Sequence, residues 1–224
     1  MKLYMHPVST TSRAVLLFAA ESGIDLDLQI VDLFKGEHLQ PAYATVNPSQ
    51  MVPVLEDGDF RLTESSTILK YLADKIRSPA YPSDAKKRAK VNEMMDWLNS
   101  NLYRDFAYGL VYSQVYPHHR RPDATVQAGT VAWGKEKAKA WLKILDADLI
   151  GPKRRFLCGD EISLADYLGA PMLTAGELVR CDFSPWPNVA RWLHNMKALP
   201  SWSKVNDGFY HLVEAVKGGA FVSI

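Results

Sequence analysis

The sequence predicts an α/β domain followed by an all-α domain. In the first third of the chain, short alternating apolar segments are interleaved with helical periodicity, which is typical of a small sheet covered by helices. Beyond that point only helical patterns occur, and all six tryptophans lie there. A stretch rich in proline and serine separates the two parts. We therefore expect a first domain over residues 1–77, a linker over 78–84 and a helical domain over 85–224.

The first domain is predicted to run strand, helix, strand, polar segment, hairpin and helix. The second strand is indicated by Leu26, Leu28 and Ile30, which alternate with polar residues. The hairpin is indicated by an Asp-Gly turn signal between two apolar segments. In chain order the predicted segments are Lys2–Met5, Thr11–Ser22, Leu26–Ile30, the polar stretch Asp32–Gln50, Val52–Leu55 and Phe60–Leu62 around the turn Glu56–Asp59, and Thr63–Ile76.

The second domain shows five helical patterns that are long enough to pack as a bundle. Ser163 and Asp166 have the spacing of an N-terminal capping box, with aspartate in the place that glutamate or glutamine usually takes. The expected helices are Asp84–Val115, Pro122–Ile150, Leu164–Val179, Pro187–Leu199 and Ser201–Val216.

Composition argues against several classes of function. A net charge of +1 gives no electrostatic footprint for nucleic acid or for an anionic membrane. The longest apolar run, Ala14–Ala20, is too short to span a bilayer. No apolar signal core precedes Pro7, so we expect a cytoplasmic protein. Cys158 and Cys181 lack the spacing of metal ligands, so we expect buried thiols and no metal site.

Candidate chemistry begins at the turn between the first strand and the first helix, which carries Ser9, Thr10 and Thr11. The N-terminus of a helix favours an anion. A hydroxyl that donates to a thiolate lowers the pKa of that thiol, because it stabilises the charged form. The same residue types are also ordinary N-caps, so a purely structural role is the alternative.

Three further positions carry candidate ligand groups. Val52 precedes Pro53, where a cis bond would expose the Val52 backbone to an extended peptide; a trans turn proline is the ordinary alternative. Glu64 and Ser65 open a helix, where they either cap it or receive the ammonium and carboxylate of a ligand. His38 is either a donor to a carboxylate or a solvated loop residue.

The order and spacing of these segments resemble the cytosolic glutathione transferases, and among them the theta-like bacterial group. The resemblance extends over essentially the whole chain. The segments that carry it are Val8–Val15, Val31–His38, Asn47–Pro53, Asp57–Phe60, Leu62–Ser65 and Phe156–Asp166.

The resemblance implies a thioredoxin-like N-terminal domain that binds glutathione, an α-helical C-terminal domain that forms most of the electrophile pocket, and a homodimer. Glutathione is the implied co-substrate, and no other cofactor is expected. By position, Ser9 is the implied thiol-activating hydroxyl; Thr10 and Thr11 are alternatives because three hydroxyls crowd this turn. Val52, before a cis Pro53, is implied to pair with the cysteinyl backbone of glutathione.

The resemblance assigns the two ends of glutathione to other residues. Glu64 and Ser65 are implied to hold the γ-glutamyl end, and His38 to lie near the glycine carboxylate. Met51 is an implied glutathione contact that stands where theta-like relatives often carry a lysine for this carboxylate, so one contact is missing or replaced.

The electrophile pocket is expected to draw on the helix Asp84–Val115. Tyr108 and Tyr112 lie at i and i+4 on one face, where they line an apolar pocket for a small hydrophobic electrophile or, alternatively, make core or dimer contacts. The expectation is therefore a detoxifying glutathione S-transferase. The alternatives are a non-catalytic protein that binds glutathione or another ligand, a glutathione-dependent dehalogenase, and a fold reused for protein–protein interaction.

Overall fold

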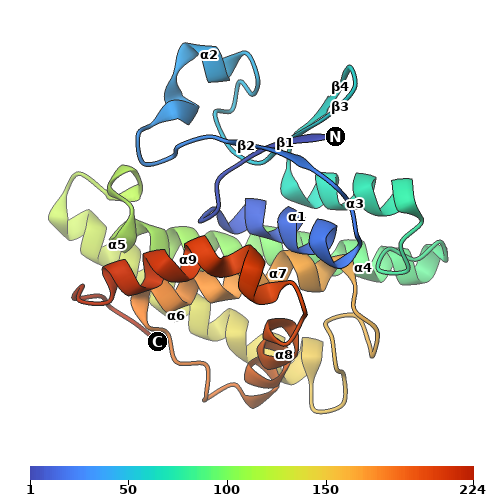
Figure 1. The fold of residues 1–224 in the computed structure, drawn as a ribbon. Helices are drawn as coiled ribbons and strands as arrows, with labels where there is room; N and C mark the ends of the chain where they lie inside the picture. Colours follow the sequence, from blue (N-terminus) through green and yellow to red (C-terminus); the bar gives the residue numbers. More distant parts are fainter.

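The computed structural model describes all 224 residues and confirms an α/β domain followed by a helical domain (Figure 1). The sheet has four strands in the order β2–β1–β3–β4. Strand β1 pairs in parallel with β2 and antiparallel with β3, and β3 pairs antiparallel with β4. The elements of this domain are β1 (Lys2–Met5), α1 (Thr10–Glu21), β2 (Asp27–Ile30), η1 (Glu37–Leu39), α2 (Pro41–Ala44), β3 (Val54–Asp57), β4 (Phe60–Leu62) and α3 (Ser65–Ile76).

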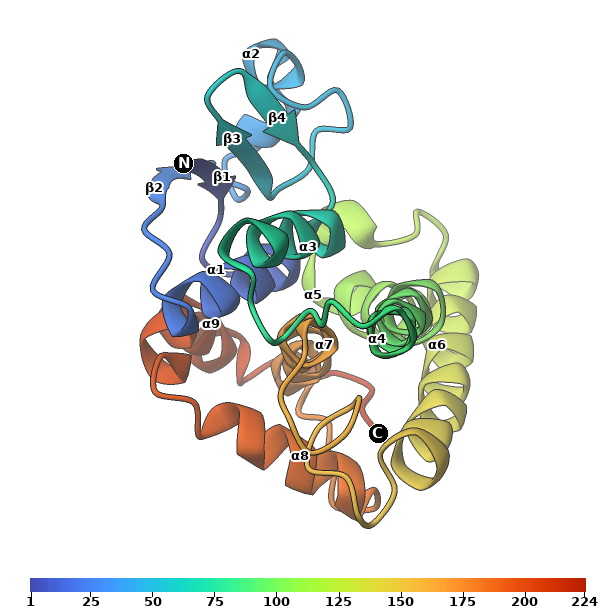
Figure 2. The same ribbon diagram turned by 90° about the vertical axis from the view of Figure 1, so that its right-hand side faces the viewer.

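The central strand β1 separates two apolar layers. Leu3 and Met5 are buried in the main core, which includes residues of α1 and α3. Tyr4 points to the other face, where its ring lies edge-on to Tyr43 of α2 at 6.3 Å between centroids. Figure 2 shows α1 and α3 below the sheet and α2 above it. The two-residue period of the strand therefore decides which side chains meet the helices.

Two predictions for this domain are corrected. The hairpin turn is tighter than predicted, because Glu56 and Asp57 belong to β3 and only Gly58 and Asp59 form the turn. The φ angle of Gly58 is +65°, which glycine adopts without steric cost. The polar stretch Asp32–Gln50 is not a plain loop, because it contains η1 and α2.

The helical domain begins with one long, uninterrupted helical segment. The predicted helix Asp84–Val115 consists of α4, η2 and α5, and its middle part has π-helical winding. The predicted capping box is confirmed, because the N–H and hydroxyl of Ser163 donate to Asp166 Oδ2 at 2.8 and 2.7 Å. No helix is long and apolar enough to cross a bilayer. The elements are α4 (Ala85–Trp97), η2 (Leu98–Tyr112), α5 (Ser113–Val115), η3 (Pro117–His119), α6 (Ala124–Ile144), η4 (Leu145–Ile150), α7 (Leu164–Thr174), η5 (Ala175–Val179), α8 (Pro187–Lys197) and α9 (Trp202–Val216).

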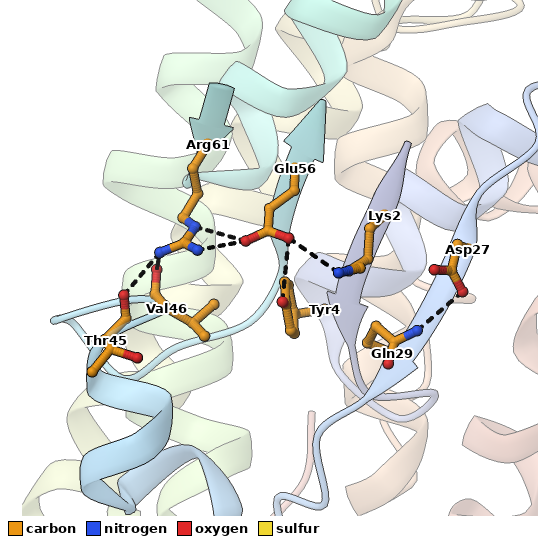
Figure 3. Close-up of polar contacts among 8 residues, drawn as sticks. All are labelled: Lys2, Tyr4, Asp27, Gln29, Thr45, Val46, Glu56 and Arg61. Atoms are coloured by element: carbon orange, nitrogen blue, oxygen red, sulfur yellow. Dashed lines mark hydrogen bonds and ion pairs between the residues drawn. The ribbon is translucent and has the colours of Figure 1, made fainter. Parts of the chain in front are cut away.

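A polar network on the sheet holds the end of α2 in place (Figure 3). Glu56 on β3 accepts from Tyr4 and pairs with Lys2 and Arg61. Arg61 also donates to the carbonyl oxygens of Thr45 at 2.8 Å and Val46 at 3.2 Å. These bonds tie the segment after α2 to the sheet, and that segment leads directly to Val52 and Pro53.

Candidate active site

The hydroxyl of Ser9 lies at the N-terminus of α1, where β1 ends. Its Oγ accepts the N–H of Ser12 at 3.2 Å, so Ser9 is the N-cap of the helix. Capping of this kind uses a lone pair and leaves the hydroxyl proton free for another acceptor. The side chain is only partly buried. Ser9 therefore combines a structural contact with a hydroxyl donor near solvent.

Thr11 connects Ser9 to the opposite side of the site. Its hydroxyl donates to the Val52 carbonyl at 3.0 Å and lies 3.1 Å from Ser9 Oγ. Because the Thr11 proton is engaged with Val52, the hydroxyl of Ser9 is the donor in the Ser9–Thr11 contact. Thr10 points elsewhere: it is buried and accepts the hydroxyl of Tyr112 at 2.5 Å. Thr11 is therefore engaged with the backbone and Thr10 is buried, whereas Ser9 is partly exposed and its proton is held only by Thr11.

The segment before β3 presents backbone groups to this turn. The Val52–Pro53 peptide bond is cis, as the resemblance implies, and Val52 lies outside the strand that was predicted to include it. The N–H of Val52 makes no hydrogen bond within the chain. The preceding carbonyl, of Met51, accepts from Tyr43 Oη and Asn47 Nδ2, both at 2.9 Å. The backbone is therefore anchored at Met51 and open at Val52, while the Met51 side chain is 53% exposed.

Glu64 and Ser65 lie at the start of α3. Glu64 is exposed and has a φ of +64°, which is unfavourable for a residue with a Cβ atom. Non-glycine residues with such angles cluster at ligand sites. Ser65 follows as the first residue of the helix and is buried. The negative charge of Glu64 contributes to raising the pKa of Tyr108 on η2, behind the larger effect of burial.

His38 lies on η1, which is linked to the segment before β3 by a bond from Gln50 Nε2 to the Leu39 carbonyl at 3.0 Å. Nδ1 of His38 is buried and has no hydrogen-bond partner. Burial lowers the pKa of His38, and the neighbouring His118 lowers it further. Figure 1 shows the segment carrying η1 above the turn that joins α5 to α6. A loop of the first domain therefore approaches a turn of the helical domain.

An aromatic cluster from the helical domain faces the turn before α1. Tyr108 is half-buried, whereas Tyr112 is 6% exposed and uses its hydroxyl to contact Thr10 and Tyr103. His119 stacks on Tyr112 with ring centroids 5.5 Å apart, and lies edge-on to Tyr108 at 5.2 Å. Burial, followed by the charges of His118 and Arg121, lowers the pKa of His119 to about 4. The predicted pair, Tyr108 and Tyr112, thus belongs to a larger wall of tyrosines and histidines.

A buried arginine joins α1 to the helical domain. Arg13 is 0% exposed and donates to Asn206 Oδ1 at 2.7 Å, Thr174 Oγ1 at 3.2 Å and the Pro171 carbonyl at 3.2 Å. Its guanidinium also stacks over Phe209 at 3.7 Å from the ring centroid. All of these partners are neutral, and burial lowers the pKa of Arg13 to about 10. The turn that carries Ser9 is therefore held by a contact between the two domains.

Reasoning from sequence missed the bond between Thr11 and Val52, the burial of Arg13, and the placement of His118 and His119. The first two depend on side-chain directions across long sequence separations. Two consecutive histidines between Pro117 and Arg120 could have indicated a polar site, but the sequence does not show which residues they contact. The two cysteines were predicted to be buried, but the structure shows that each is only partly buried.

Comparison with known proteins now decides the family. Residues 8–75 match the glutathione S-transferase N-terminal domain, and residues 116–200 match the glutathione S-transferase C-terminal domain. Human glutathione S-transferase theta-1 is 36% identical over 201 residues, which cover 88% of this chain and 82% of that protein. The chain belongs to the glutathione S-transferase family.

Solved structures of other glutathione S-transferases agree with the fold. A structure of human glutathione transferase theta-2, in complex with glutathione and an unknown ligand, has a TM-score of 0.83 at 29% identity, covering 100% of this chain and 93% of that one. A delta-class glutathione transferase from Nilaparvata lugens has a TM-score of 0.80 at 34% identity, covering 96% and 99%. The thioredoxin-like N-terminal domain implied by the resemblance is thereby confirmed, together with the helical C-terminal domain of this family. Members of this family use glutathione as co-substrate.

Proposed function

We propose that this glutathione S-transferase activates the thiol of glutathione through the hydroxyl of Ser9, for attack on small apolar electrophiles. The observation that carries the proposal is the hydrogen bonding of Ser9. Its lone pair caps α1, while its proton is held only by Thr11 and can turn to a ligand. A thiolate next to Ser9 would accept this proton and would lie at the positive end of α1.

The energies are of the right size for this role. Lowering a thiol pKa by two units, from about 8.5 to about 6.5, corresponds to about 2.7 kcal/mol. A hydrogen bond to a charged group contributes about 1.5–3 kcal/mol. The N-terminus of a helix adds up to about 1 kcal/mol. Ser9 and α1 together therefore suffice, and no metal or second base is needed.

The rest of glutathione is proposed to follow the surface between η1 and α3. The free N–H of Val52 and its carbonyl would pair with the cysteinyl backbone, beside the cis Pro53. Glu64 and Ser65 would receive the γ-glutamyl ammonium and carboxylate, and His38 would face the glycine carboxylate. The exposed side chain of Met51 would contact the same end of glutathione without supplying a charge.

The reaction then needs only a nucleophile and a nearby carbon. The thiol proton leaves to solvent, and the thiolate forms a carbon–sulfur bond as the leaving group departs with its electron pair. Tyr108 and Tyr112, with the rings around them, would provide the apolar side of the electrophile site. Replacement of a halide by this route is the dehalogenase variant of the same chemistry.

The direct test measures the ultraviolet absorbance of the glutathione thiolate on the protein as a function of pH. We expect a thiolate signal in the wild type well below the pH at which free glutathione ionises. Ser9→Ala should shift this signal toward the value for free glutathione, while Thr10→Val and Thr11→Val should shift it less. A full shift in either threonine variant would move the role to that residue. Saturable binding without a thiolate signal would indicate a non-catalytic glutathione-binding protein.

Other parts of the expectation stay predictions. They are a homodimeric assembly, a cytoplasmic location, affiliation with a bacterial theta-like group, and division of the chain into residues 1–77, 78–84 and 85–224.

A further inference from the structure

Two histidines from different domains meet beside the proposed glutathione site. His38 on η1 and His118 on η3 have ring centroids 6.4 Å apart, with 59° between the ring planes. His118 is exposed, and Nδ1 of His38 is buried without a partner. Charge-assisted hydrogen bonds to a carboxylate are about 2.7–2.9 Å long. Rings at this separation leave room for one carboxylate oxygen between two N–H groups.

We propose that His118 and His38 together hold the glycine carboxylate of glutathione. His118, from the helical domain, would take the place of the lysine that theta-like relatives often carry at the position of Met51. The inference rests on the proposed function and deepens it. Met51, the first-domain residue expected near this carboxylate, is uncharged. His118 is placed to supply a positive charge from the opposite side of the site.

The titratable groups around these two rings do not oppose a bound anion. Asp32, on the same loop as His38, is already neutralised by Lys35 at 3.1 Å and by backbone N–H groups. His6, from the turn after β1, has its pKa lowered chiefly by burial. His119 has its pKa lowered to about 4 and is therefore neutral near pH 7.

Arg121, after η3, contributes a further positive charge to this region. In the free protein, His118 disfavours charge on His38, behind the larger effect of burial. A bound carboxylate reverses that preference, because it stabilises the protonated rings.

Protonation and binding are consequently linked. A carboxylate that favours charged imidazoles binds together with protons, so affinity rises as pH falls through the range in which imidazoles titrate. The glycine carboxylate itself stays ionised throughout this range. The glutathione thiol must be blocked in the measurement, because formation of the thiolate has the opposite pH dependence.

The experiment compares S-methylglutathione with S-methyl-γ-glutamylcysteine, which lacks the glycine, by calorimetric titration at pH 8 and pH 6. We expect the wild type to bind S-methylglutathione about fivefold more tightly at pH 6 than at pH 8, since a partly exposed ion pair contributes about 1 kcal/mol. His118→Ala should lose most of this gain. His118→Lys should keep the affinity of the wild type at pH 6 but lose most of the pH dependence, because only His38 would still titrate.

Two controls make the result specific. His211→Ala, at an exposed histidine of α9 whose ionic partner is Asp207, should behave as the wild type does. The ligand without glycine should bind all variants alike. Equal binding of S-methylglutathione to the wild type and His118→Ala at pH 6 would overturn the inference and leave the transferase proposal intact. Equal losses in His118→Ala and His118→Lys would also overturn it, because they would indicate a packing role. A wild type that binds neither ligand would overturn the proposed function itself.

Discussion

Helices α1 and α7 both have a serine as the N-cap, but one serine is partly exposed and the other is buried. At α7, Ser163 and Asp166 are buried, and the carboxylate accepts from Ser163, from the Leu157 N–H and from Trp192 Nε1. At α1, Ser9 is partly exposed, and its proton is held only by a neighbouring threonine. A buried cap whose hydrogen-bonding groups are all paired can only stabilise the fold. A cap near solvent, whose proton is held by one neighbouring side chain, can also bind a ligand.

The two caps also belong to one structural unit. Helix α1 packs against α7, and Arg13 donates across this contact to the Pro171 carbonyl and to Thr174. The buried cap of α7 therefore supports α1, the helix whose own N-cap, Ser9, is partly exposed. The chemistry proposed for Ser9 would therefore depend on a scaffold whose polar groups are hydrogen-bonded elsewhere.

The largest effect on stability is expected when the capping box of α7 is disrupted. Asp166→Ala removes the acceptor of the bonds from Ser163, Leu157 and Trp192, and leaves these donors buried without partners. We expect the free energy of unfolding to fall by about 3–5 kcal/mol, as measured by urea denaturation. A loss below about 1 kcal/mol, the usual size for a simple cap, would show that Asp166 does not anchor the start of α7.

The comparison is sharpest when the same substitution is made at both caps. Ser9→Ala and Ser163→Ala should each lower the free energy of unfolding by about 1 kcal/mol. Only Ser9→Ala should lower turnover of a small alkyl or aryl halide, by about 30- to 100-fold, because it removes the proposed bond to the thiolate. Calorimetry should show that glutathione still binds to both variants. Equal turnover in the two variants would mean that Ser9 is only a cap.

A smaller effect is expected from the hydroxyl that covers Thr10. Tyr112→Phe removes the donor to Thr10 Oγ1 and the contact with Tyr103, but keeps the ring. We expect a loss of about 1 kcal/mol, which lowers the melting temperature by about 2–4 °C for a chain of this size. Turnover should remain near that of the wild type. A large loss of turnover without a change in melting temperature would instead support Thr10 as the activating hydroxyl.

An effect of similar size on stability is expected from acid. The pKa of His119 is lowered to about 4, chiefly by burial, so the unfolded chain binds a proton below about pH 6.5 that the folded protein does not. Stability should therefore fall as pH decreases from about 6.5 toward 4. Because His119 is only partly buried, we expect a loss of about 1 kcal/mol. In urea titrations at pH 7.5 and pH 5, His119→Gln should show a smaller difference than the wild type; an identical difference would contradict this assignment.

Much of the architecture could be predicted from local patterns. Alternation identified β2, an Asp-Gly signal located the hairpin, and the spacing of Ser163 and Asp166 identified the start of α7. These features depend on residues close in the chain, whose backbone preferences act within a few positions. The errors lie where local signals are weak: the turn was too wide by two residues, and the polar segment concealed η1 and α2.

By itself, the sequence determined the order of elements, the helix caps and the set of candidate residues around Ser9, Val52 and Glu64. Only the tertiary structure decided which hydroxyl stays accessible, because Thr11 bonds to Val52 across 41 positions and Thr10 is buried against Tyr112 across 102. It also decided that His118 faces His38. Contacts of this kind depend on how two domains pack, and packing is a property of the whole chain that no local pattern contains.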